Sequence, residues 1–195
     1  MSVLKDLIFH LSEVLLVPCL ALLAAFFAWT LVMLGMFARE ALERRRSAAR
    51  WKAFVAGAAD SSAAAAVPGA RGRFAAFLRE RGGDELQVEK HLQDAEMGMT
   101  KVVERASLAS KLGPMLGLMG TLIPLGPALR SLASGSVVSL SENLIVAFAT
   151  AVVGLAVAGP CFWMASVCRR WYERDLSDME FVWRRATGRP AEVLP

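Results

Sequence analysis

Three polar side chains hold positions from which they could take part in ion transfer. Thr121 and Thr150 each lie within a long apolar segment, and Glu142 stands at the beginning of the second one. A hydroxyl inside a membrane protein can line a polar path, but it can also donate to a carbonyl one turn earlier in its own helix. The residue types alone are compatible with both interpretations, so the surrounding segments have to be considered.

The two threonines lie in segments that are long enough to cross a membrane as helices. Residues 112–129 and 143–168 contain no charged side chain, and a helix needs about 20 apolar residues to cross the hydrocarbon core. We expect transmembrane helices at 111–130 and 142–168, joined by a short external loop at 131–141.

Small residues recur along both segments at spacings of three and four. In the second segment they form one stripe along a helix, and in the first segment they include a G-x-x-x-G pair. Small residues let helix backbones approach closely in lipid, so we expect both stripes to pack against other helices. The residues assigned to this packing are Gly113, Gly117, Gly120, Ala147, Ala151, Gly154 and Ala158.

Glu142 has more than one possible role. With Ser141 it could cap the N-terminus of the helix expected at 142–168, where the helix dipole favours a carboxylate. It could also pair with Arg130 at the end of the preceding helix, or it could lie in an ion path. The sequence leaves these roles open.

The two segments together resemble a known pair of motifs. Residues 117–126 read GLMGTLIPLG, and residues 141–160 read SENLIVAFATAVVGLAVAGP. They are similar to the G-x-x-G-T element and to the acidic residue, A-T-A and G-L-x-x-A-x-P elements of the MotA/TolQ/ExbB proton channel family. The resemblance extends over roughly residues 84 to 185, and it identifies the chain as a member related to the ExbB and TolQ branch.

The resemblance implies an assembly and a mechanism. Five copies would form a ring whose second and third transmembrane helices face a pore, and the pore would hold two copies of a single-span ExbD/TolR/MotB-like partner. The partner would carry the aspartate that binds the ion, while Thr121, Thr150 and Glu142 of this chain would line its path. The complex would use a proton or sodium gradient across a bacterial or archaeal cytoplasmic membrane to drive work outside that membrane.

The composition agrees with a small membrane protein. The chain has 195 residues, of which 55% are hydrophobic, and its mean hydropathy is +0.44. We expect residues 1–13 to form an amphipathic helix at the membrane surface and residues 14–37 to form the first span. Basic residues cluster after residue 37 and after residue 168. Because such clusters favour the cytoplasmic side, they predict an external N-terminus and explain the positive charge without nucleic acid.

The remaining segments are expected to be cytoplasmic and helical. Residues 38–110 should continue the first helix and then break at a linker, residues 56–72, which is rich in alanine and glycine. A long helix should begin near a cap at Asp84 and run without a break into the membrane. Residues 169–195 should form a helix followed by a tail. The predicted fold class is therefore all-α, with three transmembrane helices and long cytoplasmic helical extensions.

Several functional classes are not supported by the residue types. The spacing of the three cysteines does not suit a zinc site or a disulfide framework, and the two histidines lie far apart in the sequence without a neighbouring cysteine or acidic cluster. We expect neither a metal nor a cofactor, and we do not expect an enzyme. A non-conducting helical scaffold in the membrane remains the alternative to a channel, because it would also need small-residue stripes and basic flanks.

Overall fold

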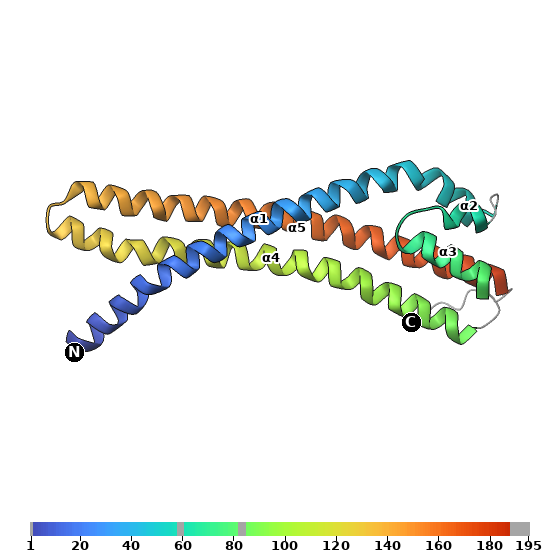
Figure 1. Cartoon of the computed structure of the whole chain (residues 1–195), viewed down its shortest axis with the longest axis horizontal. Helices are drawn as coiled ribbons and strands as arrows, with labels where there is room; N and C mark the ends of the chain where they lie inside the picture. Colours follow the sequence, from blue (N-terminus) through green and yellow to red (C-terminus); the bar gives the residue numbers. More distant parts are fainter. Residues whose placement is uncertain (1, 58–60, 82–84, 188–195) are drawn as a thin grey trace. The chain divides into compact units, whose positions relative to one another are not determined.

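The computed structural model describes residues 2–57, 61–81 and 85–187, and the regular structure in these ranges is helical throughout (Figure 1). This confirms the expected all-α class. The helices are α1 (Ser2–Val55), α2 (Ser61–Ala65), α3 (Ala70–Arg81), α4 (Glu85–Ala133) and α5 (Val137–Thr187). The chain forms two compact units, of which the first is Met1–Gly35 with Arg105–Met164 and the second is Met36–Glu104 with Ala165–Pro195.

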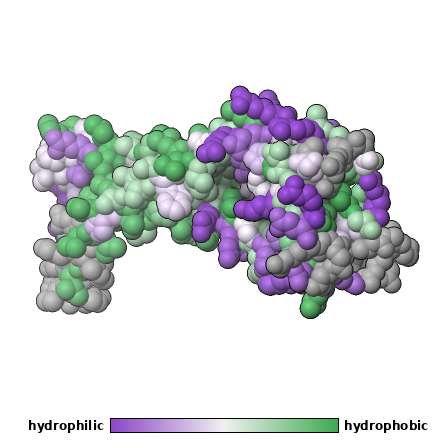
Figure 2. All heavy atoms as spheres, turned by 45° about the vertical axis from the view of Figure 1, so that its right-hand side comes forward, coloured by the Kyte–Doolittle hydropathy of each residue, from purple (hydrophilic) through white to green (hydrophobic). Residues whose placement is uncertain are grey.

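Three of the helices are long and apolar enough to cross a membrane, namely α1, α4 and α5. Within the single chain, only 17% of the most apolar stretch of α1 and 28% of those of α4 and α5 is buried. In Figure 2 apolar side chains cover much of the first unit, whereas hydrophilic side chains gather on the second. Exposed leucine, valine and phenylalanine side chains on this scale are stable in lipid or against partner helices. The expected three spans are confirmed, and the chain is a multi-pass membrane protein.

The first unit contains the hairpin of α4 and α5 and the N-terminal half of α1. The hairpin turn is shorter than the expected external loop at 131–141, because α4 continues to residue 133 and α5 begins at residue 137. Gly135 has a φ of +77°. Its N–H donates to the carbonyl of Leu132, and the N–H of Ser136 donates to that of Ser131. This is a Schellman motif, which ends a helix within two residues and so explains the short turn.

The position of the turn corrects one of the roles considered for Glu142. The carbonyl of Ser136 accepts a hydrogen bond from the N–H of Leu140 at 3.2 Å, which places Ser136 at the N-cap of α5. Ser141 and Glu142 lie within the helix, and Ser141 Oγ donates to the carbonyl of Val137 at 2.9 Å. They therefore do not cap α5.

Helix α4 is unbroken from residue 85 to residue 133, which confirms the expectation that the long cytoplasmic helix runs on into the second span. The proposed cap at Asp84 lies outside the described residues. Helix α1 is likewise continuous through the boundary expected between residues 1–13 and the first span. Of the expected amphipathic segment, the side chain of Leu7 is the described one, and it is 66% exposed.

The second unit has an apolar core. Trp51 of α1, Phe74 of α3 and Met179 of α5 are at most 2% exposed. Together with smaller buried residues they form one cluster to which all five helices contribute. The cluster consists of Trp51, Phe54, Ala64, Phe74, Ala75, Val88, Met99, Met179 and Val182.

The segment expected as a linker at 56–72 is more ordered than its composition predicts. It contains α2 and the beginning of α3, and within it Ala64 is 0% and Val67 3% exposed. A Cβ on Gly72 would lie 1.7 Å from the carbonyl oxygen of Val67. The glycine is thus needed for close packing, and the small residues that suggested a loose loop in fact allow a tight turn.

Candidate functional site

The transmembrane parts of α4 and α5 touch at the level of their backbones, and Figure 1 shows them side by side. A Cβ on Gly113 would lie 2.8 Å from the carbonyl oxygen of Gly154, and a Cβ on Gly154 would lie 2.7 Å from that of Gly113. Real Cβ atoms do not approach an oxygen so closely, so both positions require glycine. Their partner helix belongs to the same chain.

The contact continues along α4 toward the hairpin turn. A Cβ on Gly117 would lie 3.2 Å from the carbonyl oxygen of Thr150 and 3.3 Å from the Cα of Gly154. One turn further, a Cβ on Gly120 would lie 2.7 Å from the Cβ of Thr150. Gly113, Gly117 and Gly120 therefore form a groove into which the stripe of α5 fits.

The alanines assigned to packing lie on or beside this contact. Ala147 is 3% exposed, while Ala151 and Ala158 are half-buried. Further along the same stripe, Cys161 is fully buried and its Sγ lies 3.6 Å from the Oγ1 of Thr30 on α1. The stripe of α5 thus packs on two helices of its own chain, and Thr30 is a contact that the sequence reasoning missed.

Both threonine hydroxyls of the expected ion path donate within their own helices. Thr121 Oγ1 donates to the carbonyl of Leu118 at 2.7 Å, and Thr150 Oγ1 donates to that of Ala147 at 2.8 Å. Their surroundings differ, because Thr150 is 4% exposed and Thr121 is half-buried. Each hydroxyl oxygen keeps its lone pairs as acceptors, and the hydroxyl of Thr121 is the one with an accessible surface in the single chain.

Glu142 lies near the beginning of α5 and is exposed. The next residue, Asn143, donates through Nδ2 to the carbonyl of Ser139 at 2.8 Å. This end of α5 is therefore polar, whereas the stretch that follows is apolar. A carboxylate there can attract cations to the mouth of a path, but it stands two helical turns from Thr150.

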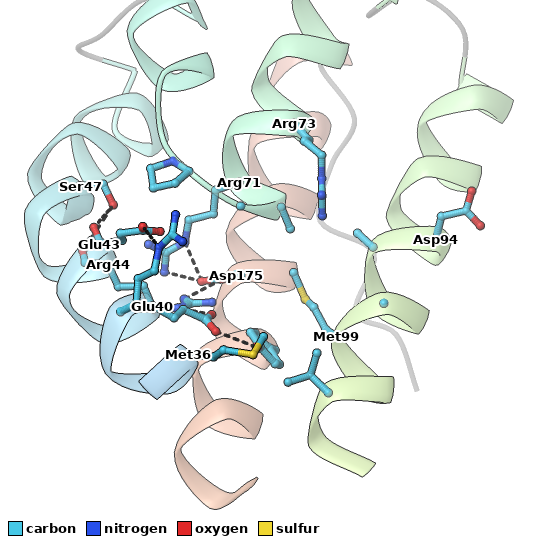
Figure 3. Close-up of a pocket in the computed structure, with 18 residues that line it drawn as sticks. Met36, Glu40, Glu43, Arg44, Ser47, Arg71, Arg73, Asp94, Met99 and Asp175 are labelled. Atoms are coloured by element: carbon cyan, nitrogen blue, oxygen red, sulfur yellow. Dashed lines mark hydrogen bonds and ion pairs between the residues drawn. The ribbon is translucent and has the colours of Figure 1, made fainter. Parts of the chain in front are cut away.

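The second unit contains a charged cluster that sequence reasoning missed (Figure 3). Asp175 of α5 is 1% exposed, and it is the one buried charged side chain in the described part of the chain. Its Oδ2 pairs with Arg44 Nη1 of α1 at 2.8 Å. Its Oδ1 accepts from Arg71 Nε of α3 at 2.8 Å, and Arg71 Nη2 pairs with the same oxygen. One carboxylate therefore joins three helices.

The cluster extends to a carboxylate and a phenol. Arg44 Nε donates to Glu40 Oε1 at 2.9 Å, and Tyr172 donates its hydroxyl to Glu40 Oε2 at 3.2 Å. Burial, reinforced by the negative charge of Glu40, raises the pKa of Tyr172 above its ordinary value. Burial opposes the charge of Arg44, but Asp175 and Glu40 outweigh this effect and raise its pKa.

The buried position of Asp175 has a signal in the sequence. The small-residue stripe of α5 ends at Cys168, and residues 172, 175, 179 and 182 continue the same alternation of four and three. Met179 and Val182 on this continuation are 0% and 8% exposed. Following the stripe beyond the apolar segment would have placed Asp175 on the buried face of the helix.

Beside this cluster lies a cavity of about 440 Å³, lined by residues of α1, α3, α4 and α5 and by the turn before α3. In Figure 3, Glu40 and Arg44 of α1 lie on one side of this space and Asp94 of α4 lies on the other. No group of three or more potential metal ligands occurs within residues 2–57, 61–81 and 85–187.

The comparisons agree with the motifs in α4 and α5. The model of the MotA/TolQ/ExbB proton channel family matches residues 75–181, which is more than half of the chain. The match covers all of α4, the hairpin turn and most of α5. Neither the curated proteins nor the solved structures include a match to this chain.

Proposed function

Because the chain belongs to the MotA/TolQ/ExbB proton channel family, we propose that it is the channel-forming subunit of an ion-driven membrane motor. Five copies form a ring, and the transmembrane parts of α4 and α5 face its pore. Two single-span partner chains of the ExbD/TolR/MotB type occupy the pore and supply the aspartate that binds the ion. The complex transfers energy from a proton or sodium gradient to work outside the membrane.

The main support for this proposal is that the region matched by the family model is also the region in which glycines of α4 contact α5. The matched region contains Gly113, Gly117 and Gly120, whose Cβ positions are closed by the backbone or by Thr150 of α5. A hairpin packed in this way has a defined orientation, so its other faces are available for neighbours and for a pore. Each elementary charge crossing 100 mV releases about 2.3 kcal/mol, which is enough to bias a rotation or tilt of one component.

The three polar residues then have separate roles. Thr121 presents the accessible hydroxyl and contacts the ion or its water as it passes the aspartate of the partner. Thr150 supports this step from a buried position, and its hydroxyl oxygen can accept a hydrogen bond. Glu142 raises the local concentration of cations at the outer end of α5.

A non-conducting scaffold is the second candidate function. It is favoured by the fact that both hydroxyls already donate to carbonyls of their own helices. A scaffold needs close packing and basic flanks, but it needs no partner with an aspartate.

The test is reconstitution of the chain with a candidate partner, a one-span protein with an aspartate in its span encoded beside it. Native mass determination in detergent should give five copies of this chain with two partner copies, and vesicles should show ion-gradient dissipation that depends on the aspartate. Vesicles loaded with a pH indicator, with and without a sodium gradient, distinguish the two ions. A stable oligomer that excludes the partner and conducts neither ion would favour the scaffold.

A further inference from the structure

We propose that α2 and α3 form a cover that the ion pair of Asp175 with Arg71, the latch, holds against α1 and α5, and that release of this latch exposes the buried inner wall of the neighbouring cavity at Ser47. The latch consists of Asp175 and Arg71, with Arg44 as the fixed partner on α1. This device belongs to the second unit and does not depend on the proposed channel function.

The cover behaves as one body because its two helices are joined by a tight turn. The N–H of Val67 donates to the carbonyl of Ala64 at 3.0 Å at the end of α2. At the beginning of α3, a Cβ on Gly72 would meet the carbonyl oxygen of Val67 at 1.7 Å. The same Cβ would lie 3.0 Å from the carbonyl oxygen of Ala65 in α2, so the backbones of α2 and α3 are in close contact and the two helices should move together.

The latch is the ionic part of the contact between the cover and the other helices. Arg71 pairs with one carboxylate oxygen of Asp175, and Arg44 pairs with the other. The arginine side chains are 16% and 17% exposed and that of Asp175 is 1% exposed. A buried charge requires partners, so an unpaired carboxylate or guanidinium here would be strongly unfavourable. The cover is therefore bound most strongly when the carboxylate of Asp175 pairs with both arginines.

The contact between the cover and the other helices also has an apolar part. Phe74 and Ala75 of α3 are fully buried, and both lie in the cluster that contains Trp51 of α1 and Met179 of α5. The guanidinium carbon of Arg71 also lies 5.6 Å from the ring centroid of Trp51. Ala64 of α2 belongs to the same cluster, and the partly buried Ala70, Phe77 and Leu78 of α3 pack against it, so the ionic latch acts together with this apolar contact.

The position of the cover determines access to the inner wall of the cavity, whereas the rim at Met36 and Arg39 is already exposed. The turn before α3 and its first residues, among them Arg71 and Arg73, form one wall of the cavity, and Ser47 of α1 forms part of another. Ser47 is 2% exposed although it lines this space. Moving the cover away would expose Ser47, which makes this residue a reporter of the latch.

The experiment measures the reaction of a thiol at position 47 with a maleimide. Ser47→Cys replaces the hydroxyl of a buried side chain with a thiol. The parent chain, which has three buried cysteines, gives the background rate of the maleimide reaction. In S47C the thiol should react slowly. In the double variant S47C with Arg71→Gln, the thiol should react about tenfold faster or more. The reason is that Asp175 still pairs with Arg44 of α1 but no longer pairs with a side chain of α3.

Arg39→Gln is the matched control. Arg39 also lines the cavity, but its side chain is 82% exposed and pairs with Glu43 of the same helix. Removing this charge should leave the reaction of S47C unchanged. Equal acceleration by R39Q and R71Q would show that the charge of the cavity, not the latch, controls access and would overturn the proposal.

Hydrogen exchange separates release of the cover from loss of the fold. In R71Q, exchange should accelerate in residues 61–81 while the α4 residues 88–103 keep their protection. Asp175→Asn should give the same pattern with a larger change, because it removes the charge that both arginines share. Unchanged exchange in residues 61–81 of both variants, or acceleration of residues 88–103 to the same extent in R71Q, would contradict the latch.

Discussion

Gly120 and Thr150 face each other so closely that a Cβ on the glycine would lie 2.7 Å from the Cβ and 2.8 Å from the Oγ1 of the threonine. The threonine side chain fills the space that the glycine leaves, and it is 4% exposed. The glycine that precedes Thr121 in the first motif thus accommodates the threonine of the second motif. The two motifs therefore pack against each other within one chain, and this contact does not need a second copy of the chain.

Gly120→Ala should loosen the hairpin of α4 and α5. The added methyl group would overlap the side chain of Thr150, and overpacking of this kind costs about 1–3 kcal/mol. We expect a lower thermal midpoint of the detergent-solubilised protein, with partial recovery in the double variant with Thr150→Ala, whose side chain is smaller. Gly35→Ala is the control, because no atom lies within 4 Å of its Cβ position. Equal midpoints for G120A and the parent would show that the hairpin adjusts without cost.

Thr121→Val and Thr150→Val should each reduce ion flux while the ring still assembles. Valine keeps the size of the side chain but removes the hydroxyl, and the lost hydrogen bond to Leu118 or Ala147 costs only about 1 kcal/mol. If the hydroxyl contacts the ion, flux through the complex with its partner should fall about tenfold or more, which corresponds to about 1.4 kcal/mol of barrier. Normal flux in both variants would remove these hydroxyls from the pathway.

The sequence predicts the helices well because their signals are local. Apolar length identifies the three spans, and the absence of a helix breaker between Asp84 and Gly113 predicts that the cytoplasmic helix continues into the second span. The sequence could not say which helix a small-residue stripe meets, since a stripe shows only that something approaches closely. The structure places the glycines of α4 against Gly154 of the same chain, so the packing that could have joined two copies is used within one.

The errors have physical causes as well. The segment at 56–72 looked loose because it offers few large side chains, yet Gly72 allows a backbone contact that larger residues would prevent. The charged cluster was missed because Asp175 was treated as part of a polar cytoplasmic helix. Its partners Arg44 and Arg71 are distant in sequence, and nothing local connects them with it. The roles of Thr121 and Glu142 in an ion path remain predictions.

Glu142→Gln should lower ion flux without destabilising α5. Glu142 is exposed and does not cap the helix, so the free energy of unfolding should stay within about 0.5 kcal/mol of that of the parent protein. A negative charge at the entrance of a path concentrates cations, and salt screens this effect with a Debye length of about 10 Å at 0.1 M. Flux should therefore fall several-fold at low ionic strength and less at high ionic strength. A loss that is independent of salt would indicate direct participation in ion transfer instead.

Tyr172 provides a measurable pH dependence, since it is the single tyrosine of the chain. Burial and Glu40 raise its pKa above the ordinary value of 10.0. In the folded protein the ultraviolet absorbance of tyrosinate should appear at higher pH than after denaturation. Because the unfolded chain ionises first, the stabilisation is complete below pH 10 and is lost as the pH rises above it.

Two variants of Tyr172 and its partner check the cause. Glu40→Gln removes a nearby negative charge, so the folded-state titration should move toward lower pH. Tyr172→Phe should remove the tyrosinate signal and weaken the loss of stability above pH 10. A folded protein whose tyrosine titrates as it does in the denatured chain would show that the phenol is not buried against Glu40.

Gly135→Ala and Gly98→Ala make the same chemical change but should have opposite effects on stability. No atom lies within 4 Å of either Cβ position, so steric overlap does not contribute. Gly135 has a φ of +77° in the turn between α4 and α5, and alanine in this conformation costs about 1–2 kcal/mol. Gly98 lies inside α4, where alanine is favoured over glycine by about 0.5–1 kcal/mol. The thermal midpoint should therefore fall for G135A and rise for G98A. Equal shifts in one direction would show that the turn does not hold Gly135 in this conformation, and the register of the hairpin would then have to be set by the contact of Gly113 and Gly154 alone.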